Sequence, residues 1–251
     1  MINSATAIEA ITPLGHELAM RLATVEYDRL LAVVDELRDD DWSRPTDCTE
    51  WDVRAVLGHI LGALELQADP DERMRQMTAA ARVAAQTGGL RIDALTALQV
   101  SEHRGLTTDQ LKRALHEMTP RGLGARRGTT QPMRDAPYDA QLPGESGWTV
   151  GYLFDVILTR DPWIHRIDIC RAIGSAPDLS SDHDGRIVAD VVADWARHHH
   201  QPFMLTLSGP AGGAFIAGHD GDDFHLDAVE FCRTISGRER ATGLLATRVI
   251  F

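Results

Sequence analysis

Apolar residues recur at helical spacing through most of the first two thirds of this chain, and most clearly over residues 146–174. Thr149 is suited to act as the N-cap of this segment, with Trp148 and Leu153 spaced as a hydrophobic staple. Gly174 is suited to end it. The pattern therefore predicts one long amphipathic helix. Its apolar positions are Val150, Leu153, Phe154, Ile157, Leu158, Ile164, Ile167 and Cys170.

Shorter helical segments precede this long helix. Amphipathic spacing predicts one helix over residues 14–38 and a second that begins near Asp52, its expected N-cap. Residues 121–134 are rich in arginine and glycine, have no clear period, and are expected to form a loop or a frayed helix end. The long helix would then close a helical bundle. The other helical segments begin after Pro70, after Gly89 and at Thr108.

The pattern changes character after the long helix. Apolar and polar residues alternate over residues 202–209, which predicts a strand. Residues 213–218 and 248–251 are expected to form two further short strands. Asp227 is expected to cap a short helix that Gly237 ends.

A helix over residues 186–197 is expected to come before these strands. The length of 251 residues suits one large domain or two small ones. The sequence thus predicts an α+β protein, in which a helical domain of residues 1–178 precedes a small α/β domain of residues 179–251.

Composition excludes several classes of function. The formal net charge of -12 argues against non-specific nucleic-acid binding, which requires a basic face. No apolar run approaches the roughly 18 residues of a membrane span, and residues 1–18 lack the pattern of a secretory signal. The widely spaced Cys48, Cys170 and Cys232 indicate reduced thiols in a cytoplasm. We expect a cytoplasmic monomer or small homo-oligomer that acts on small molecules.

Asp161 and His165 stand four residues apart, a spacing that brings both side chains to one helix face and within reach of one metal ion. Asp161 and Pro162 can begin a fresh helix as N-cap and first residue. Alternatively, one helix continues with a kink and releases the carbonyl of Leu158. His59 lies among apolar neighbours in mid-helix, where a single histidine is more often a core residue than a ligand. Spacing alone leaves the metal site open.

Four short motifs follow one another along the chain. They are Cys48-Thr49-Glu50-Trp51-Asp52-Val53-Arg54 leading to Leu57-Gly58-His59, then Asp161-x-x-x-His165-Arg166-x-Asp168, the segment SGPAGG, and Ser236-Gly237-Arg238. Together and in this order they resemble the mycothiol-dependent maleylpyruvate isomerase family. The resemblance implies a DinB-like up-down four-helix bundle followed by a small domain similar to sterol-carrier folds.

In that family, a histidine on the second helix and a Glu-x-x-x-His pair on the last bundle helix hold zinc. The resemblance therefore implies His59, Asp161 and His165 as the metal ligands of this chain. Here Asp stands where Glu is usual, and Pro162 follows it. The shorter side chain requires that the metal lie closer to the helix, bind through water, or be lost. Two histidines and a carboxylate would also suit iron(II).

Zinc with three protein ligands keeps a position open for water or a thiol, and a coordinated thiol is deprotonated. The resemblance implies mycothiol as that thiol, acting in the cis–trans isomerisation of a maleylpyruvate-like substrate or in S-transfer. One alternative is a metal-dependent hydrolase that uses metal-bound hydroxide. Another is a ligand-binding protein that keeps the fold without catalysis.

The remaining candidates each have two interpretations. Asp168 either orients a metal ligand from behind or pairs with Arg171 on the helix surface. Arg126 and Arg127 belong to a basic segment that forms either a clamp for substrate or thiol, or a solvated loop. The resemblance implies that Arg238 holds the substrate's carboxylate, whereas a purely structural Arg238 would bond the last carbonyls of its helix.

Two further groups of residues, two arginines and three histidines, also bear on the candidate sites. Arg240 and Arg248 are the nearby alternatives to Arg238. His198, His199 and His200 resemble a metal-binding run, but adjacent residues on a helix point in different directions. We expect these three histidines to mark an exposed helix end.

Overall fold

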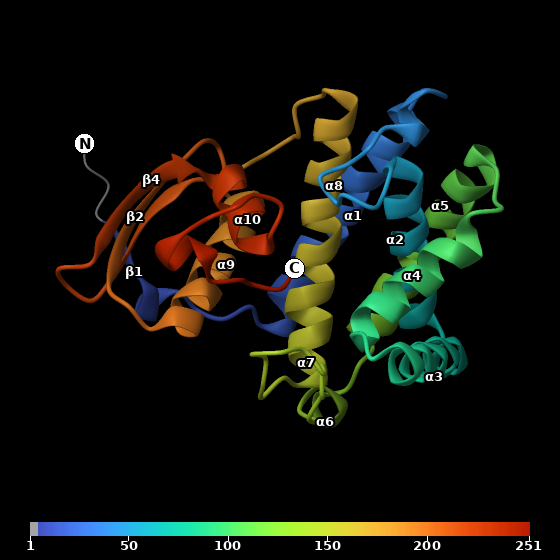
Figure 1. Ribbon diagram of the computed structural model, residues 1–251, viewed down its shortest axis with the longest axis horizontal. Coiled ribbons are helices and arrows are strands. Elements are labelled where there is room, and N and C mark those ends of the chain that lie inside the picture. The colour runs from blue at the N-terminus through green and yellow to red at the C-terminus, as the bar shows by residue number, and fades with distance from the viewer. Residues whose placement is uncertain (1–4) are drawn as a thin grey trace. The chain divides into compact units, whose positions relative to one another are not determined.

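The computed structural model describes residues 5–251, which divide into two compact units (Figure 1). The first unit, His16–Ala176, is helical. The second joins the segment that ends at Gly15 to Pro177–Phe251 and contains a small sheet. Met1–Ser4 lie outside the described residues. The fold is α+β, as predicted.

The helical unit is a four-helix bundle with two inserted helices (Figure 1). The bundle helices are α1 (His16–Glu36), α2 (Val53–Ala68), α5 (Thr108–Arg127) and α8 (Leu158–Ile173). The inserted helices are α3 (Pro70–Thr87) and α4 (Arg91–His103). They pack against each other, and α4 also lies along α2. The short elements are a 3-10 turn at Asp41–Ser43, α6 (Gln131–Arg134), α7 (Val150–Tyr152) and a π-helical turn at Leu153–Ile157.

One apolar cluster fills the bundle. Leu30, Leu57, Leu61, Leu111 and Ile169 represent all four helices and are almost completely buried. Each such side chain contributes about 1.5–3 kcal/mol through burial. The stripe of apolar residues on each helix therefore holds the bundle together. No helix among residues 5–251 combines the length and the apolar character needed to cross a membrane.

Capping side chains set several helix boundaries where the sequence predicts them. Asp52 accepts a hydrogen bond from the backbone N–H of Ala55 at 2.8 Å, and Thr149 accepts one from Tyr152 at 3.0 Å. Gly174 ends α8 with a φ of 72°, in the left-handed region that glycine adopts without strain. These predictions are confirmed.

Helix α5 differs from the prediction at both ends. Its N-cap is Thr107, which forms a capping box with Gln110 one residue earlier than expected. The helix continues to Arg127 and Gln131–Arg134 form the short helix α6, so the expectation of a loop or a frayed helix end over residues 121–134 is wrong for most of that range. Gly122 lies inside this helix, and a Cβ there would lie 2.9 Å from the side chain of Leu64. Glycine permits the close approach of α5 to α2, and packing outweighs its low helix propensity.

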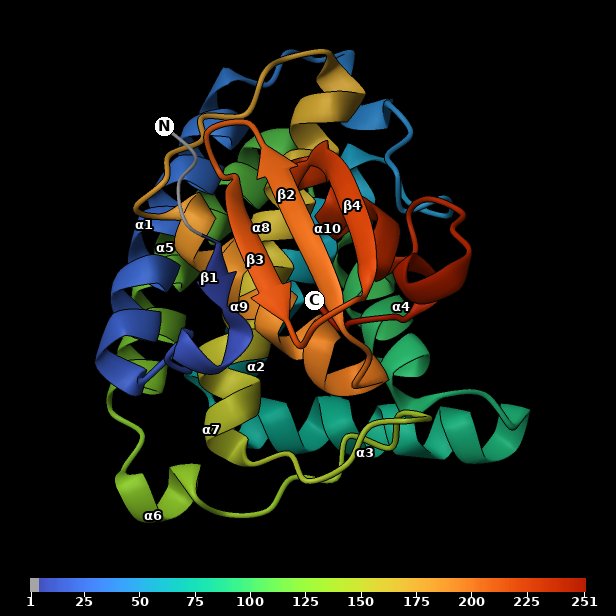
Figure 2. The same ribbon diagram turned by 90° about the vertical axis from the view of Figure 1, so that its left-hand side faces the viewer.

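The second unit is a four-stranded sheet with two helices behind it (Figure 2). The strand order is β1-β3-β2-β4; β2 is antiparallel to β3, whereas the pairs β1/β3 and β2/β4 are parallel. The Trp195 ring packs against Phe203 at 4.8 Å and Phe231 at 5.3 Å between ring centroids. The elements are β1 (Thr6–Ala7), a 3-10 turn at Ile8–Ala10, α9 (Asp184–His199), β2 (Phe203–Ser208), β3 (Gly213–Ala217), β4 (Asp222–Asp227), α10 (Ala228–Ser236) and a 3-10 turn at Gly243–Ala246.

Three features of this unit differ from the sequence prediction. Strand β1 pairs with Phe215 and Ile216, so the N-terminal segment belongs with the sheet and not with the helical domain of residues 1–178. Two residues are too few to show a period. Strand β4 was not predicted because its exposed aspartates hide the apolar alternation. Residues 248–251 form no strand.

The long C-terminal segment of the bundle is helical from Val150 to Ile173, through the π-helical turn and across Pro162. Proline lacks an N–H and leaves the carbonyl four residues earlier, that of Leu158, without its helical donor. The buried Arg126 guanidinium supplies the donor: Nη1 lies 2.9 Å from the Leu158 oxygen and Nη2 lies 2.8 Å from Oγ1 of Thr159. Asp161 therefore lies inside a continuous helix and is not an N-cap.

Arg126 and Pro162 should be energetically coupled. Arg126→Met leaves the Leu158 carbonyl unsatisfied, which costs about 1–3 kcal/mol of unfolding free energy. In a Pro162→Ala background the restored N–H can bond that carbonyl, so the same substitution should cost less. Urea unfolding of the wild type, both single variants and the double variant measures the coupling. Additive costs, within about 0.5 kcal/mol, would show that Arg126 does not act on this carbonyl.

Candidate metal centre

Three side chains from two neighbouring bundle helices converge on one point. His59 comes from α2, and Asp161 and His165 come from α8. The Asp161 Oδ1 oxygen lies 3.2 Å from Nε2 of His59 and 3.5 Å from Nε2 of His165. The three side chains are 8%, 16% and 7% exposed in that order. The structure thus brings together the three residues that the sequence nominated as ligands.

Local structure explains this convergence. The four-residue spacing stacks Asp161 and His165 on one face of α8, because the helix is unbroken across Pro162. Asp52 caps α2 about two turns before His59 and thereby begins the helix that carries it. The two imidazoles meet nearly edge to face, with 5.3 Å between ring centroids.

The far nitrogen of each imidazole also has a partner. His59 Nδ1 lies 2.8 Å from Oε1 of Gln99, and His165 Nδ1 lies 3.1 Å from Oδ2 of the fully buried Asp168. The Cys48 thiol lies 3.6 Å from the same Asp168 oxygen. Both rings are therefore held so that their Nε2 atoms face Asp161.

Charge in the cluster is strongly perturbed. Burial alone would raise the pKa of the Asp161 carboxyl, but attraction to His59 and hydrogen bonds with both imidazoles hold that pKa well below its usual range. Burial alone would lower the pKa of His165, yet its hydrogen bonds to Asp161 and Asp168 raise it well above the ordinary value. The cluster thus favours positive charge between the imidazoles and the carboxylate.

These residues fit a divalent metal ion. One ligand atom from each of His59, Asp161 and His165 lies within 4.8 Å of the other two. Two imidazole nitrogens and one carboxylate oxygen form a donor set typical of zinc sites that keep an open position. The shorter aspartate still reaches both histidines, because Oδ1 is within 3.5 Å of each Nε2.

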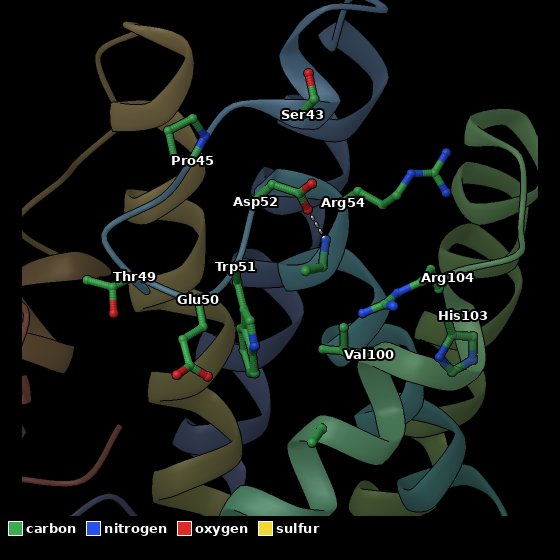
Figure 3. Close-up of a pocket in the computed structure, with 12 residues that line it drawn as sticks. Ser43, Pro45, Thr49, Glu50, Trp51, Asp52, Arg54, Val100, His103 and Arg104 are labelled. Carbon is green, nitrogen blue, oxygen red and sulfur yellow. Dashed lines mark hydrogen bonds between the residues drawn. The ribbon is translucent and has the colours of Figure 1, made fainter.

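Trp51 connects this cluster to a pocket of ≈ 680 Å³ (Figure 3). Its ring centroid lies 5.1 Å from that of His59 and 6.0 Å from that of His165. The pocket is bounded by the loop before α2 and by α4. Arg104 extends toward Trp51 in Figure 3 and has no ion-pair partner among the described residues, whereas Arg54 points away. The pocket therefore joins an aromatic face to an available cation.

His103, which also lines the pocket, bonds two acceptors. Its Nδ1 lies 2.7 Å from the Gln99 carbonyl oxygen, and its Nε2 lies 3.2 Å from Oε2 of Glu65. Burial opposes the charged form, but the bond to Glu65 and the bond to the Gln99 carbonyl outweigh it and raise the pKa of His103. This pair links α4 to α2 beside the cluster.

The other residues that the sequence nominated lie outside this cluster of three side chains. Arg126 is buried against Leu158 and Thr159, and the exposed Arg127 donates to Oγ1 of Thr24 at 3.2 Å. Arg238 belongs to the sheet-containing unit, just after the end of α10. Arg134 of the basic segment pairs with Asp155, and His199 packs on Trp195.

Sequence reasoning missed Gln99, Gln76, His103 and the role of Trp51 beside the cluster. One signal could have pointed to the two glutamines: each is a polar residue at a buried position of a helix whose outer face is polar. A buried amide requires partners, and here they lead to His59.

Comparisons with known proteins agree with this architecture. Residues 23–170 match the mycothiol maleylpyruvate isomerase N-terminal domain. Crystal structures of the mycothiol-dependent maleylpyruvate isomerase and of its histidine-to-alanine mutant are each similar to this chain, with a TM-score of 0.60 and 14% identity. Each match covers 93% of this chain and 92% of that one, which shows a shared fold. No curated protein matches the sequence.

The His103–Glu65 pair should make stability depend on pH. Because folding raises the pKa of His103, its contribution is complete below the ordinary histidine value of about 6.5 and is lost as pH rises through the folded value. Glu65→Gln should therefore reduce the unfolding free energy most below pH 6.5, with a difference that shrinks at alkaline pH. Denaturant unfolding from pH 5.5 to 9 measures this, and a difference constant across that range would contradict it.

Proposed function

This chain belongs to the mycothiol maleylpyruvate isomerase family, whose N-terminal domain spans more than half of it, and we propose that it is a metal- and thiol-dependent enzyme. The metal would be zinc, held by His59, Asp161 and His165. The thiol would be mycothiol, and the reaction would be cis–trans isomerisation of a maleylpyruvate-like substrate or the related S-transfer.

One observation carries the proposal most directly. The Asp161 Oδ1 oxygen lies within 3.5 Å of two buried imidazole nitrogens, and one ligand atom from each of the three residues lies within 4.8 Å of the other two. The far nitrogens of both rings are already bonded. Such a convergence of two imidazoles and a carboxylate is the donor arrangement that a divalent metal ion requires. A bound divalent ion would stabilise the anionic form of a thiol and so make it a nucleophile at neutral pH.

The chain's own residues would then position the reactants. Asp168 holds the His165 ring by its Nδ1 atom, which keeps Nε2 directed at the centre. The pocket beside Trp51 would hold the polar body of the thiol or substrate, with Arg104 as its cation. Arg238 would hold a substrate carboxylate, a task for which the forked guanidinium is well shaped.

The reaction balances without a further co-reactant. Bound mycothiol would supply a nucleophile for reversible addition to one carbon of an activated cis alkene, with the electron pair held in the conjugated carbonyl. Because that carbon–carbon bond would then be single and free to rotate, return of the electron pair with loss of the thiolate would give the trans isomer. If protonation of the carbon intercepts the adduct before expulsion, the product is a thioether, which is the outcome of S-transfer.

Activity should require the thiol. We expect turnover of a maleyl-type substrate by zinc-supplemented protein to fall to background when mycothiol is omitted. An analogue with serine in place of the cysteine should not restore it, because an alcohol is far less readily ionised and a poorer leaving group. Product analysis distinguishes the trans isomer from a thioether. Turnover that continues unchanged without thiol would reject this proposal and favour the metal-dependent hydrolase.

We expect the side chain of Arg238, and not only its backbone, to contribute to catalytic efficiency. The helix end it follows is already closed by its backbone N–H, which lies 2.9 Å from the Arg233 carbonyl oxygen, a bond that alanine retains. Arg238→Ala should therefore lower kcat/KM at least tenfold, about 1.4 kcal/mol of transition-state stabilisation. Arg238→Lys should recover part of it, and Arg240→Ala, at an exposed position, tests the nearby alternative. Equal kinetics in Arg238→Ala and wild type would leave Arg238 a structural residue.

A further inference from the structure

We propose that Gln99 and Gln76 are positioning residues that hold the His59 ring with its proton on Nδ1, so that Nε2 presents a lone pair to the metal. This inference deepens the proposed function and rests on it where metal affinity is concerned. It assigns a role to α3 and α4, the two helices inserted into the bundle, since Gln76 lies on α3 and Gln99 lies on α4.

A chain of hydrogen bonds runs from the backbone of α2 back to His59. Gln76 Nε2 lies 3.1 Å from the carbonyl oxygen of Gly62, and Gln99 Nε2 lies 2.9 Å from Oε1 of Gln76. Gln99 Oε1 in turn lies 2.8 Å from Nδ1 of His59. Gln76 is fully buried, and Gln99 and His59 are only 2% and 6% exposed.

The direction of donation along these hydrogen bonds follows from the first bond, the one to Gly62. A carbonyl oxygen can only accept, so the Gln76 group that meets Gly62 must be its NH₂, and its oxygen must face Gln99. Gln99 then donates to that oxygen, which turns its own oxygen toward His59. An oxygen partner requires a proton on Nδ1. The backbone of Gly62 thus determines, through two amides, which nitrogen of His59 carries a hydrogen.

A second acceptor anchors the same amide. Gln76 Nε2 also lies 2.9 Å from Oε1 of Glu72. Arg75 donates to both Glu72 oxygens, at 2.8 Å and 2.6 Å, and this partner is the main reason that the pKa of the Glu72 carboxyl is lowered. An ionised carboxylate cannot donate, so flipping the Gln76 amide would set its oxygen against two acceptors at once.

Close packing between α2 and α4 positions Gln99 beside His59. A Cβ on Gly62 would lie 2.6 Å from Cγ and 3.2 Å from Cα of Gln99, and a Cβ on Gly58 would lie 3.3 Å from Cβ of His103. These two glycines, one helical turn apart on α2, let α4 approach closely enough for a short amide contact. Any side chain at residue 62 would displace Gln99 from His59.

The consequence appears on the other side of the ring. With its proton on Nδ1, a neutral His59 turns a lone pair toward Oδ1 of Asp161, 3.2 Å away, and two acceptors face each other. A cation between them resolves the conflict. Asp161 and Asp168 already supply two negative charges, which balance a divalent ion, so an uncharged amide behind His59 avoids an excess of negative charge.

The test compares Gln99→Leu with the control variant Gln67→Leu. Gln67 is another buried glutamine, which donates to the Ala63 carbonyl on α2 and takes no part in the hydrogen bonds that lead to His59. In chelator-treated, ¹⁵N-labelled wild type, His59 should show an Nδ1–H resonance protected from solvent exchange. That signal should be lost in Gln99→Leu and kept in Gln67→Leu. Zinc affinity, from competition with a chromophoric chelator, should fall about 10–100-fold in Gln99→Leu only.

Gln76→Leu provides a second variant, since it leaves Gln99 in place but frees its amide to flip. It should weaken the Nδ1–H signal and zinc binding less than Gln99→Leu does, and it covers the case in which that variant fails to fold. A protected Nδ1–H in a wild type that binds no zinc would support the hydrogen-bond chain while rejecting the metal. Unchanged signal and zinc affinity in both folded variants would overturn the inference.

Discussion

The hydrogen bonds from Arg126 to the carbonyl of Leu158 and the hydroxyl of Thr159 are the contacts on which the site geometry depends. Pro162 follows Asp161 directly and removes the donor that would normally stabilise α8 at this point. With the guanidinium in place, α8 continues, and Asp161 and His165 remain one turn apart on the same face. A helix that restarted at Asp161 would use that carboxylate as a cap and lose it as a ligand.

The two inserted helices have a related role. A bundle of α1, α2, α5 and α8 suffices to bring the three ligand side chains together, but it leaves the outer nitrogen of His59 without a partner. Helices α3 and α4 supply that partner, and Gly58 and Gly62 permit the close packing that this requires. On α8 itself, Asp168 does the same for His165. Each ring is thus oriented from behind by a buried group.

Sequence patterns predicted most of the bundle because its signals are local. Caps at Asp52 and Thr149 and the apolar stripes of the long helices depend on residues a few positions apart. The glycine at residue 122 inside α5 allows close contact with Leu64, far away in sequence, and no local period reveals that contact. The ligand trio was nominated from a family resemblance, whereas Gln99 and Gln76 act only through contacts between helices.

The central claim is that His59, Asp161 and His165 bind one divalent metal ion. The most direct measurement is the metal content of protein purified without chelators and then titrated with zinc, alongside Asp161→Asn. The account predicts close to one equivalent of metal in wild type and a large loss in the variant, because the amide removes the charge and binds weakly. Less than about a tenth of an equivalent in wild type, not restored by added zinc, would contradict it.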